Sequence, residues 1–291
     1  MTEPRRDIWA EWLAVRRHGG DSELQRRMRE ETAEFRERVL DGANLAAGET
    51  VLDVGCGDGL IGLGALDRGA RHVVFSDISD DLLDSCREAA HALGVAARCS
   101  FVRAAADDLA GIAGESVDIV TTRSVLIYVA DKARAFSEFL RVLRPGGRVS
   151  LFEPINRFGR GTCREGFWGY PVDGVAELAA RVERVFKEIQ PADDPMLDFD
   201  ERDLVSIAEG AGFFPVGLDL HAVVRAINPA PWDAFLNSSG NPRMPTIAEA
   251  IDQALTPAER ERFSEHLRPL VEEGRGVWRM AQAYLRAGKP A

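Results

Sequence analysis

The chain has 291 residues, of which 45% are hydrophobic and 29% are charged, as in ordinary globular proteins. Its formal net charge of −11 disfavours a broad nucleic-acid interface, because neutralising phosphates requires clustered lysines and arginines. The four cysteines lack zinc-site or disulfide-framework spacing, and no apolar run approaches the roughly 20 residues that span a bilayer. These features predict a cytoplasmic protein with a small-molecule substrate, no bound metal, and neither nucleic acid nor membrane as a partner.

The first 40 residues predict at least one charged amphipathic helix, which is interrupted at 18–21 by the sequence His-Gly-Gly-Asp. We expect residues 1–40 to form an N-terminal helical segment that acts as a lid.

A glycine-rich turn follows the first predicted strand. Residues 51–54 are mostly β-forming, and glycine occupies every second position from 55 to 59. An apolar repeat of helical period begins at Leu60. This junction of strand, turn and helix directs backbone N–H groups and a helix N-terminus toward a ligand over the strand end.

Strands and helices then alternate along the chain. The sequence predicts further strands at 71–77, 98–104 and 117–123, and a Pro-Gly-Gly turn leads into a fifth that ends near 154. Helices follow the second and fourth strands, with Ser79 as the N-cap of one and a start near Asp131 for the other. Such alternation implies a parallel sheet covered on both faces.

Two segments interrupt this pattern. Residues 154–200 are rich in glycine, proline and aromatic residues, and we expect an inserted lid whose regular structure is a short amphipathic helix near 173–188. A helix and a sixth strand follow, and His221 within that strand is expected to be packed. A second insertion, at 226–275, has a predicted helix after Thr256, and a last strand ends the chain.

Together these motifs resemble the class I S-adenosylmethionine-dependent methyltransferases over residues 45–225 and the final strand. The stretch LDVGCGDG at 52–59 is similar to the first motif of the family, and Asp77 ends the second strand as its second motif requires. Residues 140–154, LRVLRPGGRVSLFEP, are similar to the segment through the fifth strand.

The resemblance implies an α/β fold with a doubly wound, seven-stranded, mostly parallel sheet whose last strand is antiparallel. The methyltransferase core would comprise residues 41–225 and 276–290. The insertions at 154–200 and 226–275 would form a helical substrate cap.

The resemblance also implies S-adenosyl-L-methionine as the cofactor. Gly55 and Gly57 would let the backbone lie against its amino-acid tail, and Asp53 would orient the turn or take the tail ammonium through water. Asp77 would accept both ribose hydroxyls, with a solvated turn acid as the alternative. Ile78 would pack on the adenine face.

Three further residues complete the expected cofactor site. The family often has Asp-Ala-x-x-Leu after the third strand, where this chain has alanine in place of the aspartate. Asp107 or Asp108 would substitute in reading the adenine, or either would be a solvated acid at a helix start. Arg123, at the end of the fourth strand, would contact the tail through its backbone. Its side chain would either reach a carboxylate or be structural.

Methyl transfer requires alignment of donor and acceptor, exclusion of water and, for some acceptors, removal of a proton. His18 is the candidate general base, because it precedes two glycines that could form a hinge. Glu153 is the second catalytic candidate, and its alternative role is an ion pair with a nearby arginine.

Aromatic residues concentrate in the three segments that set acceptor specificity in this family. Stacking on them suits a flat, largely apolar acceptor, although the same residues could form the core of the cap. Arg17 could hold a carboxylate, or it could be a solvated residue of a helix face. The expected substrate-binding residues are Trp12, Arg17, Phe158, Trp168, Tyr170 and Trp232.

The sequence therefore predicts a methyltransferase, monomeric or homodimeric, that acts on a small aromatic metabolite or natural product at O, N or C. A protein or RNA methyltransferase is the first alternative, and a basic groove leading to the donor would favour it. A non-catalytic S-adenosylmethionine-binding protein or an NAD-dependent oxidoreductase is the alternative from another class.

Overall fold

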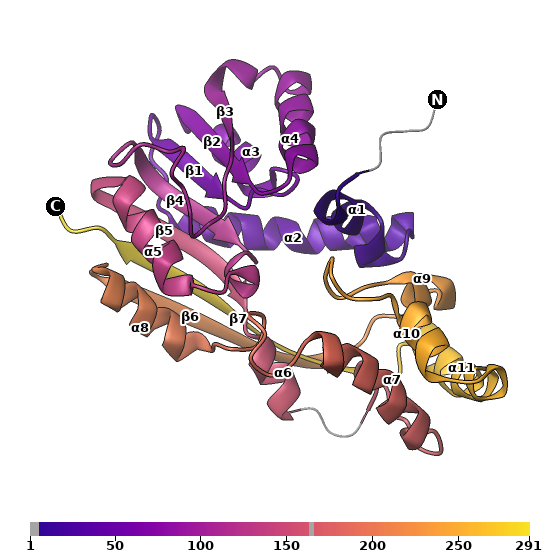
Figure 1. Ribbon diagram of the computed structural model, residues 1–291. Helices are drawn as coiled ribbons and strands as arrows, with labels where there is room; N and C mark the ends of the chain where they lie inside the picture. Colours follow the sequence, from indigo (N-terminus) through magenta and orange to yellow (C-terminus); the bar gives the residue numbers. More distant parts are fainter. Residues whose placement is uncertain (1–5, 163–165) are drawn as a thin grey trace. The chain divides into compact units, whose positions relative to one another are not determined.

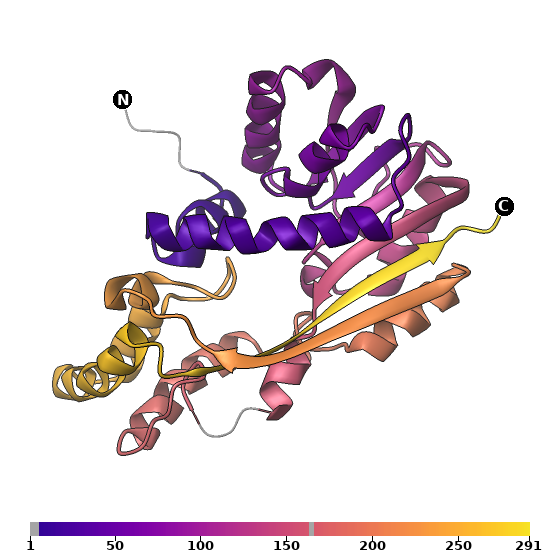
Figure 2. The ribbon, with the colours of Figure 1, turned by 180° about the vertical axis from the view of Figure 1, so that it is seen from behind.

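The computed structural model describes residues 6–162 and 166–291, which form two compact units (Figures 1 and 2). Unit 1 comprises the described residues up to Arg29, Asn156–Asp194 and Ala222–Ala281. Unit 2 comprises Glu30–Ile155, Pro195–His221 and Gln282–Ala291.

Seven strands form one sheet, most of which lies in unit 2. They are β1 (Thr50–Val54), β2 (His72–Asp77), β3 (Cys99–Arg103), β4 (Val117–Arg123), β5 (Leu143–Pro154), β6 (Val216–Ala226) and β7 (Val277–Gly288). Their spatial order is β3-β2-β1-β4-β5-β7-β6. The first five strands pair in parallel and β7 pairs antiparallel with β5, which confirms the fold expected from the sequence.

Helices cover both faces of this sheet. They are α2 (Ser22–Gly42), α3 (Leu60–Asp67), α4 (Asp80–Ala92), α5 (Lys132–Val142) and α8 (Glu201–Ala211), with the 3₁₀ helices η2 (Ala96–Arg98) and η3 (Leu126–Tyr128). In Figure 1, α5 and α8 lie in front of the sheet, whereas Figure 2 shows α2 on the opposite face. Ser79 caps α4 as predicted, and Asp131 caps α5, which begins where the sequence predicted a helix.

The sheet is held by a core of aliphatic and aromatic side chains. Val51, Val73 and Ile119 are in register on β1, β2 and β4, and all three are fully buried. Leu40 of α2 and Ile61 of α3 belong to the same cluster. Because this core fixes the strands side by side, it also fixes the relative positions of the strand ends.

Unit 1 is mainly helical. Its helices are α1 (Ile8–Ala14), η1 (Arg16–His18), α6 (Asn156–Thr162), α7 (Ala176–Ile189), α9 (Trp232–Asn237), α10 (Ile247–Ala254) and α11 (Pro257–Glu272). A separate core of apolar residues joins α7, α9, α10 and α11, in which the Phe167 and Phe263 rings lie 5.3 Å apart. The helix predicted after Thr256 is present, and Pro257 is its first residue.

Two expectations are wrong at the level of single elements. Residues 156–162 were expected to lack regular structure, but they form α6. The glycines within this segment interrupt the apolar periodicity by which a helix is recognised in the sequence. One of them allows close packing, since a Cβ on Gly159 would lie 3.3 Å from the Arg279 carbonyl oxygen. His221, expected to be packed, is exposed because β6 is an edge strand.

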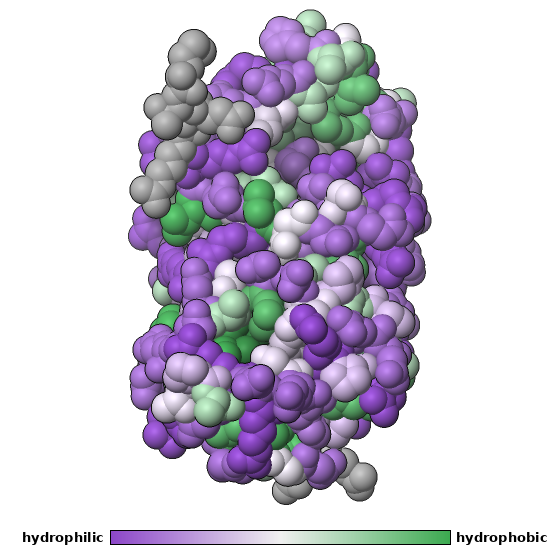
Figure 3. Space-filling model, turned by 90° about the vertical axis from the view of Figure 1, so that its right-hand side faces the viewer, coloured by the Kyte–Doolittle hydropathy of each residue, from purple (hydrophilic) through white to green (hydrophobic). Residues whose placement is uncertain are grey.

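Hydrophilic side chains predominate on the face shown in Figure 3, where apolar side chains form separate patches. No helix among the described residues is both long and apolar enough to cross a bilayer. The described His, Cys, Asp and Glu residues also form no group of three that could hold a metal ion.

Candidate functional site

Four of the predicted site residues meet at one edge of the sheet. Since β1, β2, β4 and β5 run in parallel, their carboxyl ends lie on the same side. Gly55 follows β1, Asp77 ends β2 and Arg123 ends β4. Glu153 is the penultimate residue of β5. Tertiary structure thus brings together residues that are up to a hundred positions apart in the sequence.

The turn after β1 depends on glycine. Gly55, Gly57 and Gly59 have φ angles of 60°, 56° and 84°, a region that other residues rarely adopt. A Cβ on Gly55 would also lie only 2.3 Å from Cγ2 of Val125. The glycines predicted to permit close backbone approach therefore have a demonstrable steric role in shaping this turn.

Asp77 holds the same turn from the neighbouring strand. Its Oδ2 accepts the Gly57 N–H at 3.0 Å, and its Oδ1 accepts the Ser79 N–H at 3.0 Å. A carboxylate has about four acceptor positions, so an acid that orients a turn can also accept hydroxyls. The adjacent Ile78 side chain is 42% exposed and offers an apolar surface to a planar ring.

Asp53 is buried beneath the turn. Its Oδ2 accepts the Gly62 N–H at 2.8 Å, and its Oδ1 accepts the Thr121 hydroxyl at 3.1 Å. Burial raises the pKa of Asp53 to about 7, against the opposing effect of these two hydrogen bonds. Asp53 therefore ties the first turn of α3 to β4.

The loop after β3 carries the two candidate adenine-binding acids. Asp107 is half-buried, and its backbone carbonyl accepts the Arg134 Nε at 2.7 Å. Asp108 is exposed. Glu138 of α5 accepts the Leu109 N–H at 2.8 Å. Helix α5 thus fixes the backbone of this loop, and both carboxylates remain candidates.

Arg123 lies half-buried at the end of β4. Burial lowers the pKa of its guanidinium, whereas Asp58 and Asp53 act in the opposite direction. Arginine stays protonated in proteins because its ordinary pKa is above 12. The charged group thus lies among carboxylates at the strand ends, which stabilise its positive charge.

Glu153 is fully buried, and burial raises its pKa to about 7. Its carboxylate accepts three consecutive backbone N–H groups, those of Val125, Leu126 and Ile127. The sequence left an ion pair with an arginine as the alternative role of Glu153, but its hydrogen-bond partners are these three backbone amides. Local sequence could not identify these amides as the partners of Glu153, because they lie 26 to 28 positions before it in the chain.

Two cysteines support the glycine turn in a way that sequence reasoning missed. The Cys86 thiol on α4 donates to the Gly57 carbonyl at 3.2 Å and lies 3.8 Å from the sulfur of Cys56. The hydrogen bond with Cys86, together with burial, raises the pKa of Cys56 well above its ordinary value. Cys56 thus packs beneath the turn as a thiol, and Cys86 holds the turn through its hydrogen bond to Gly57.

The candidate base His18 belongs to unit 1, in η1. Its side chain is 6% exposed, and neither ring nitrogen has a hydrogen-bond partner among residues 6–162 and 166–291. A Cβ on the following Gly19 would lie 2.0 Å from the Ala234 carbonyl oxygen. The Ser239 N–H donates to the Arg16 carbonyl at 2.8 Å. This turn is therefore docked against the α9 region of the same unit.

The predicted acceptor-binding residues of unit 1 fall into three groups by exposure. Tyr170 and Trp232 are buried in the core, where each packs against Phe235, and this is the packing role left open by the sequence. Trp168 is 42% exposed and has a φ of 52°, an uncommon conformation for a bulky residue. The remaining candidates are half-buried.

Those half-buried candidates are Trp12, Arg17 and Phe158. Trp12 donates from its indole nitrogen to the Ser239 carbonyl at 2.9 Å, and the Arg17 guanidinium lies 5.4 Å from the centre of its ring. A cation over an aromatic face leaves that ring ordered. Trp12 and Arg17 are thus one preformed pair on the N-terminal segment.

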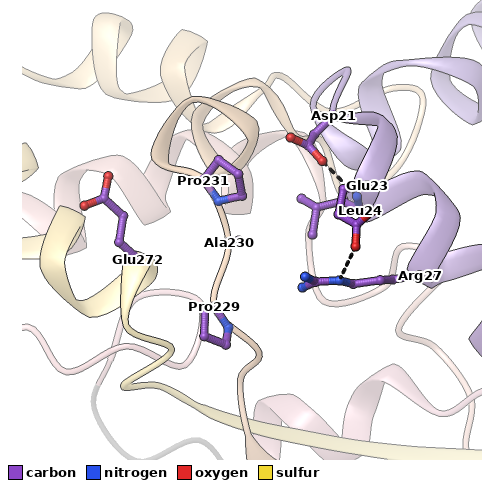
Figure 4. A pocket seen from close by; sticks show the side chains of 8 residues that line it. All are labelled: Asp21, Glu23, Leu24, Arg27, Pro229, Ala230, Pro231 and Glu272. Atoms are coloured by element: carbon purple, nitrogen blue, oxygen red, sulfur yellow. Dashed lines mark hydrogen bonds and ion pairs between the residues drawn. The ribbon is translucent and has the colours of Figure 1, made fainter.

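A pocket of about 330 Å³ also lies within unit 1 (Figure 4). It is lined by Asp21, Glu23, Leu24, Arg27, Pro229, Ala230, Pro231 and Glu272. Figure 4 shows that Asp21 and Glu23 are engaged locally, with the Leu24 N–H and with Arg27. None of the predicted site residues lines this pocket, so we do not assign it to the donor or the acceptor.

The sheet order and the glycine turn are those of a Rossmann-like domain, a fold in which ligands bind at the carboxyl ends of the strands. Residues 52–151 match the family described as a methyltransferase domain. This match agrees with the resemblance of the sequence motifs to the class I S-adenosylmethionine-dependent methyltransferases, a family whose cofactor is S-adenosyl-L-methionine.

Curated relatives match mainly through this domain. The tRNA 5-carboxymethoxyuridine methyltransferase of Escherichia coli strain K12 is 37% identical over 101 residues, which are 35% of this chain and 38% of that protein. The ubiquinone biosynthesis O-methyltransferase of Aliivibrio fischeri strain MJ11 is 34% identical over 119 residues, 41% of this chain and 49% of that protein. The chain therefore matches less than half the length of each.

Among solved structures, the Haemonchus contortus phosphoethanolamine N-methyltransferase 2 in complex with S-adenosyl-L-methionine is similar with a TM-score of 0.54. The match covers 98% of this chain and 57% of that chain at 19% identity. At this identity the likeness supports the fold, and the acceptor has to be argued from this chain's own residues.

Proposed function

We propose that this chain transfers the methyl group of S-adenosylmethionine to a small aromatic acceptor, such as a natural product. The observation that carries the proposal is the hydrogen bond from the Gly57 N–H to the Asp77 carboxylate. This bond holds a turn with positive φ angles beside the exposed apolar side chain of Ile78. These residues lie in the matched methyltransferase domain. The bound cofactor supplies the activated methyl group, and the protein aligns it and excludes water.

The small aromatic acceptor is supported by the side chains of unit 1. Trp168 exposes 42% of its surface, and Trp12 carries the Arg17 guanidinium on its ring. We propose that these residues and Phe158 contact the acceptor, and that Tyr170 and Trp232 support that surface from the core. Arg17 would favour an acceptor with an anionic substituent.

We propose His18 as the general base for acceptors that must lose a proton. A base needs a nitrogen whose lone pair is available. Both ring nitrogens of His18 are buried and have no partner within the described part of the chain. A buried polar group in that state is costly unless a ligand or water completes it.

Thermal unfolding with added ligands is the first test. A ligand at 100 times its Kd stabilises the folded state by about 2.7 kcal/mol, so S-adenosylmethionine and S-adenosylhomocysteine should raise the Tm and NAD should not. Incubation of a metabolite extract with methyl-labelled S-adenosylmethionine should then label a low-molecular-mass aromatic compound. Stabilisation by NAD alone would identify an oxidoreductase instead.

RNA is the second candidate acceptor, because a relative at 37% identity is named as a tRNA methyltransferase. The net charge of −11 opposes it. The same labelled donor should be offered with total tRNA and with a protein extract. Incorporation into either macromolecule, with none into small molecules, would overturn the proposed acceptor class. Donor binding without any incorporation would indicate a non-catalytic binding protein.

A further inference from the structure

The chain changes direction sharply after β4. Ser124 has a φ of 57°, and its N–H donates to the Phe152 carbonyl of β5 at 2.9 Å. The short helix η3 begins directly afterwards. The first N–H groups of a helical turn have no carbonyl partner within the turn, so a buried turn needs an acceptor from elsewhere.

We propose that Glu153 is a positioning residue of the donor site, an inference that rests on the proposed placement of the donor at the glycine turn. Oε1 of Glu153 accepts the N–H groups of Val125 and Leu126, both at 2.9 Å. Oε2 accepts the N–H of Ile127 at 3.2 Å. One buried carboxylate therefore satisfies three consecutive amides of the loop after β4.

The anchored loop packs against the glycine turn. Val125 is the first anchored residue of this loop. The Cγ2 atom of Val125 lies 2.3 Å from the position that a Cβ on Gly55 would take, so it fills the space beside that glycine. The chain of contacts thus runs from Glu153 through the Val125 backbone to its side chain and then to Gly55. The carboxylate sets the position of the turn that binds the donor without touching the donor itself.

The same geometry separates Glu153 from the role of general base. Both of its oxygens are engaged by backbone donors, whereas the His18 ring nitrogens have no hydrogen-bond partner among the described residues. A base must come within hydrogen-bond reach of the proton that it removes. Leu126 and Ile127, which follow Val125 on the loop, are also buried, so the anchored amides cannot turn to water instead.

Glu153→Gln tests this role, because the amide keeps one acceptor oxygen and presents an NH₂ group to backbone donors. We expect the Kd for S-adenosylhomocysteine, measured by calorimetry, to rise about tenfold, which corresponds to about 1.4 kcal/mol. Amide hydrogen exchange at residues 125–127 should accelerate, and the amide proton resonances of Val125 and Leu126 should move upfield. The chemical shifts report on this loop directly, and acceleration of exchange confined to residues 125–127 distinguishes a local effect from a general loss of stability.

Asp118→Asn is the matched control. Asp118 also accepts a backbone N–H, that of Thr50 at 2.8 Å, and pairs with Arg144, but it lies at the opposite ends of β1 and β4. This variant should bind S-adenosylhomocysteine with the affinity of the unmodified protein. Unchanged affinity and unchanged exchange at 125–127 in Glu153→Gln would overturn the proposal.

Val125→Ala provides a second route if Glu153→Gln does not fold. It leaves the backbone hydrogen bonds to Glu153 in place and removes the contact with Gly55. We expect a several-fold rise in Kd with normal exchange protection at 125–127, whereas an unchanged Kd would break the proposed link. Asp77→Ala tests the donor site itself. If Asp77→Ala weakens binding and the other two variants do not, the positioning role alone fails. If Asp77→Ala also leaves binding unchanged, the placement of the donor fails.

Discussion

Asp77 and Gly57 are joined by a hydrogen bond of 3.0 Å, in which the backbone N–H of the glycine donates to Oδ2 of the acid. This bond connects the end of β2 to the turn after β1. It places the carboxylate that should bind the ribose in direct contact with the turn that should bind the amino-acid tail. One substitution should therefore disturb both parts of the cofactor site.

Asp77→Ala should weaken the binding of S-adenosylmethionine by roughly 1.5 to 3 kcal/mol, the range of charge-assisted hydrogen bonds. Isothermal titration calorimetry measures this difference directly. Asp84→Ala is the matched control, since Asp84 is an exposed acid of α4 that pairs with Arg87. Equal affinities for the two variants would remove Asp77 from the cofactor site.

The two tryptophans Trp168 and Trp232 should separate binding from packing. Trp168→Ala should raise the KM for the acceptor with little change in Tm, because the ring is 42% exposed. Trp232→Ala should destabilise the protein by about 3 to 5 kcal/mol, since it empties a position in the core of unit 1. Urea unfolding and steady-state kinetics on both variants test the contrast. A stable Trp168→Ala variant with normal KM would exclude Trp168 from the acceptor site.

His18→Leu should keep or raise the Tm while it lowers turnover. The ring nitrogens of His18 are buried without partners in the described chain, so an apolar side chain of similar size removes unsatisfied polar atoms. If His18 is the base, turnover should fall by about 10²- to 10⁴-fold with donor affinity retained. His221→Leu, on the exposed edge strand, serves as the control. Normal turnover of His18→Leu at saturating acceptor would show that no base acts at this position.

Lys132 should be essential for the stability of unit 2. Its Nζ donates to the carbonyls of Val129 and Pro195 and to the carboxylate of Asp198, at 3.0, 3.1 and 2.7 Å. Lys132→Met should cost about 2 to 3 kcal/mol, at the low end for a buried pair because Asp198 is one-third exposed.

The corresponding exposed pair is Lys187 with Glu183, and Lys187→Met should cost less than about 1 kcal/mol. Chemical unfolding gives both values, and hydrogen exchange at 195–199 should accelerate in Lys132→Met alone. Equal losses in the two variants would contradict the anchoring role of Lys132.

Stability should fall as the pH rises toward neutrality. Burial raises the pKa of Asp53 from its usual 3.8 to about 7, so the native state binds more protons than the unfolded state between these values. The stabilising contribution is full below the unfolded pKa and is lost as the pH passes through about 7. Asp53→Asn should reduce the steepness of this part of the curve of unfolding free energy against pH, and the slope that remains belongs to Glu153, whose pKa burial also raises to about 7.

Glu259→Gln is a control of opposite sign. The hydrogen bond from Arg181 lowers the pKa of Glu259 to about 2, so its contribution is present above 4.5 and is lost as the pH falls through about 2. This variant should leave the curve near neutrality unchanged. A curve that keeps its slope between pH 4 and 7 in Asp53→Asn would show that Asp53 does not titrate there.

Much of the fold followed from short-range patterns. The glycine turn, the end of β2 at Asp77 and the caps Ser79 and Asp131 all depend on conformational preferences and hydrogen bonds within a few residues. The alternation of strands and helices also predicted the parallel sheet. Such features are legible in the sequence because the residues that cause them are neighbours in the chain.

Long-range packing decided the roles of individual side chains. Trp168 and Trp232 are the same residue type, yet Trp168 is exposed and Trp232 lies in a core, where its ring stacks on that of Phe235. Glu153 lies near the end of a strand, a common place for an acid. Only the fold brings to it the three backbone N–H groups that donate to its carboxylate. Periodicity indicates which face of an element is apolar, but the group that packs against that face comes from a distant part of the chain.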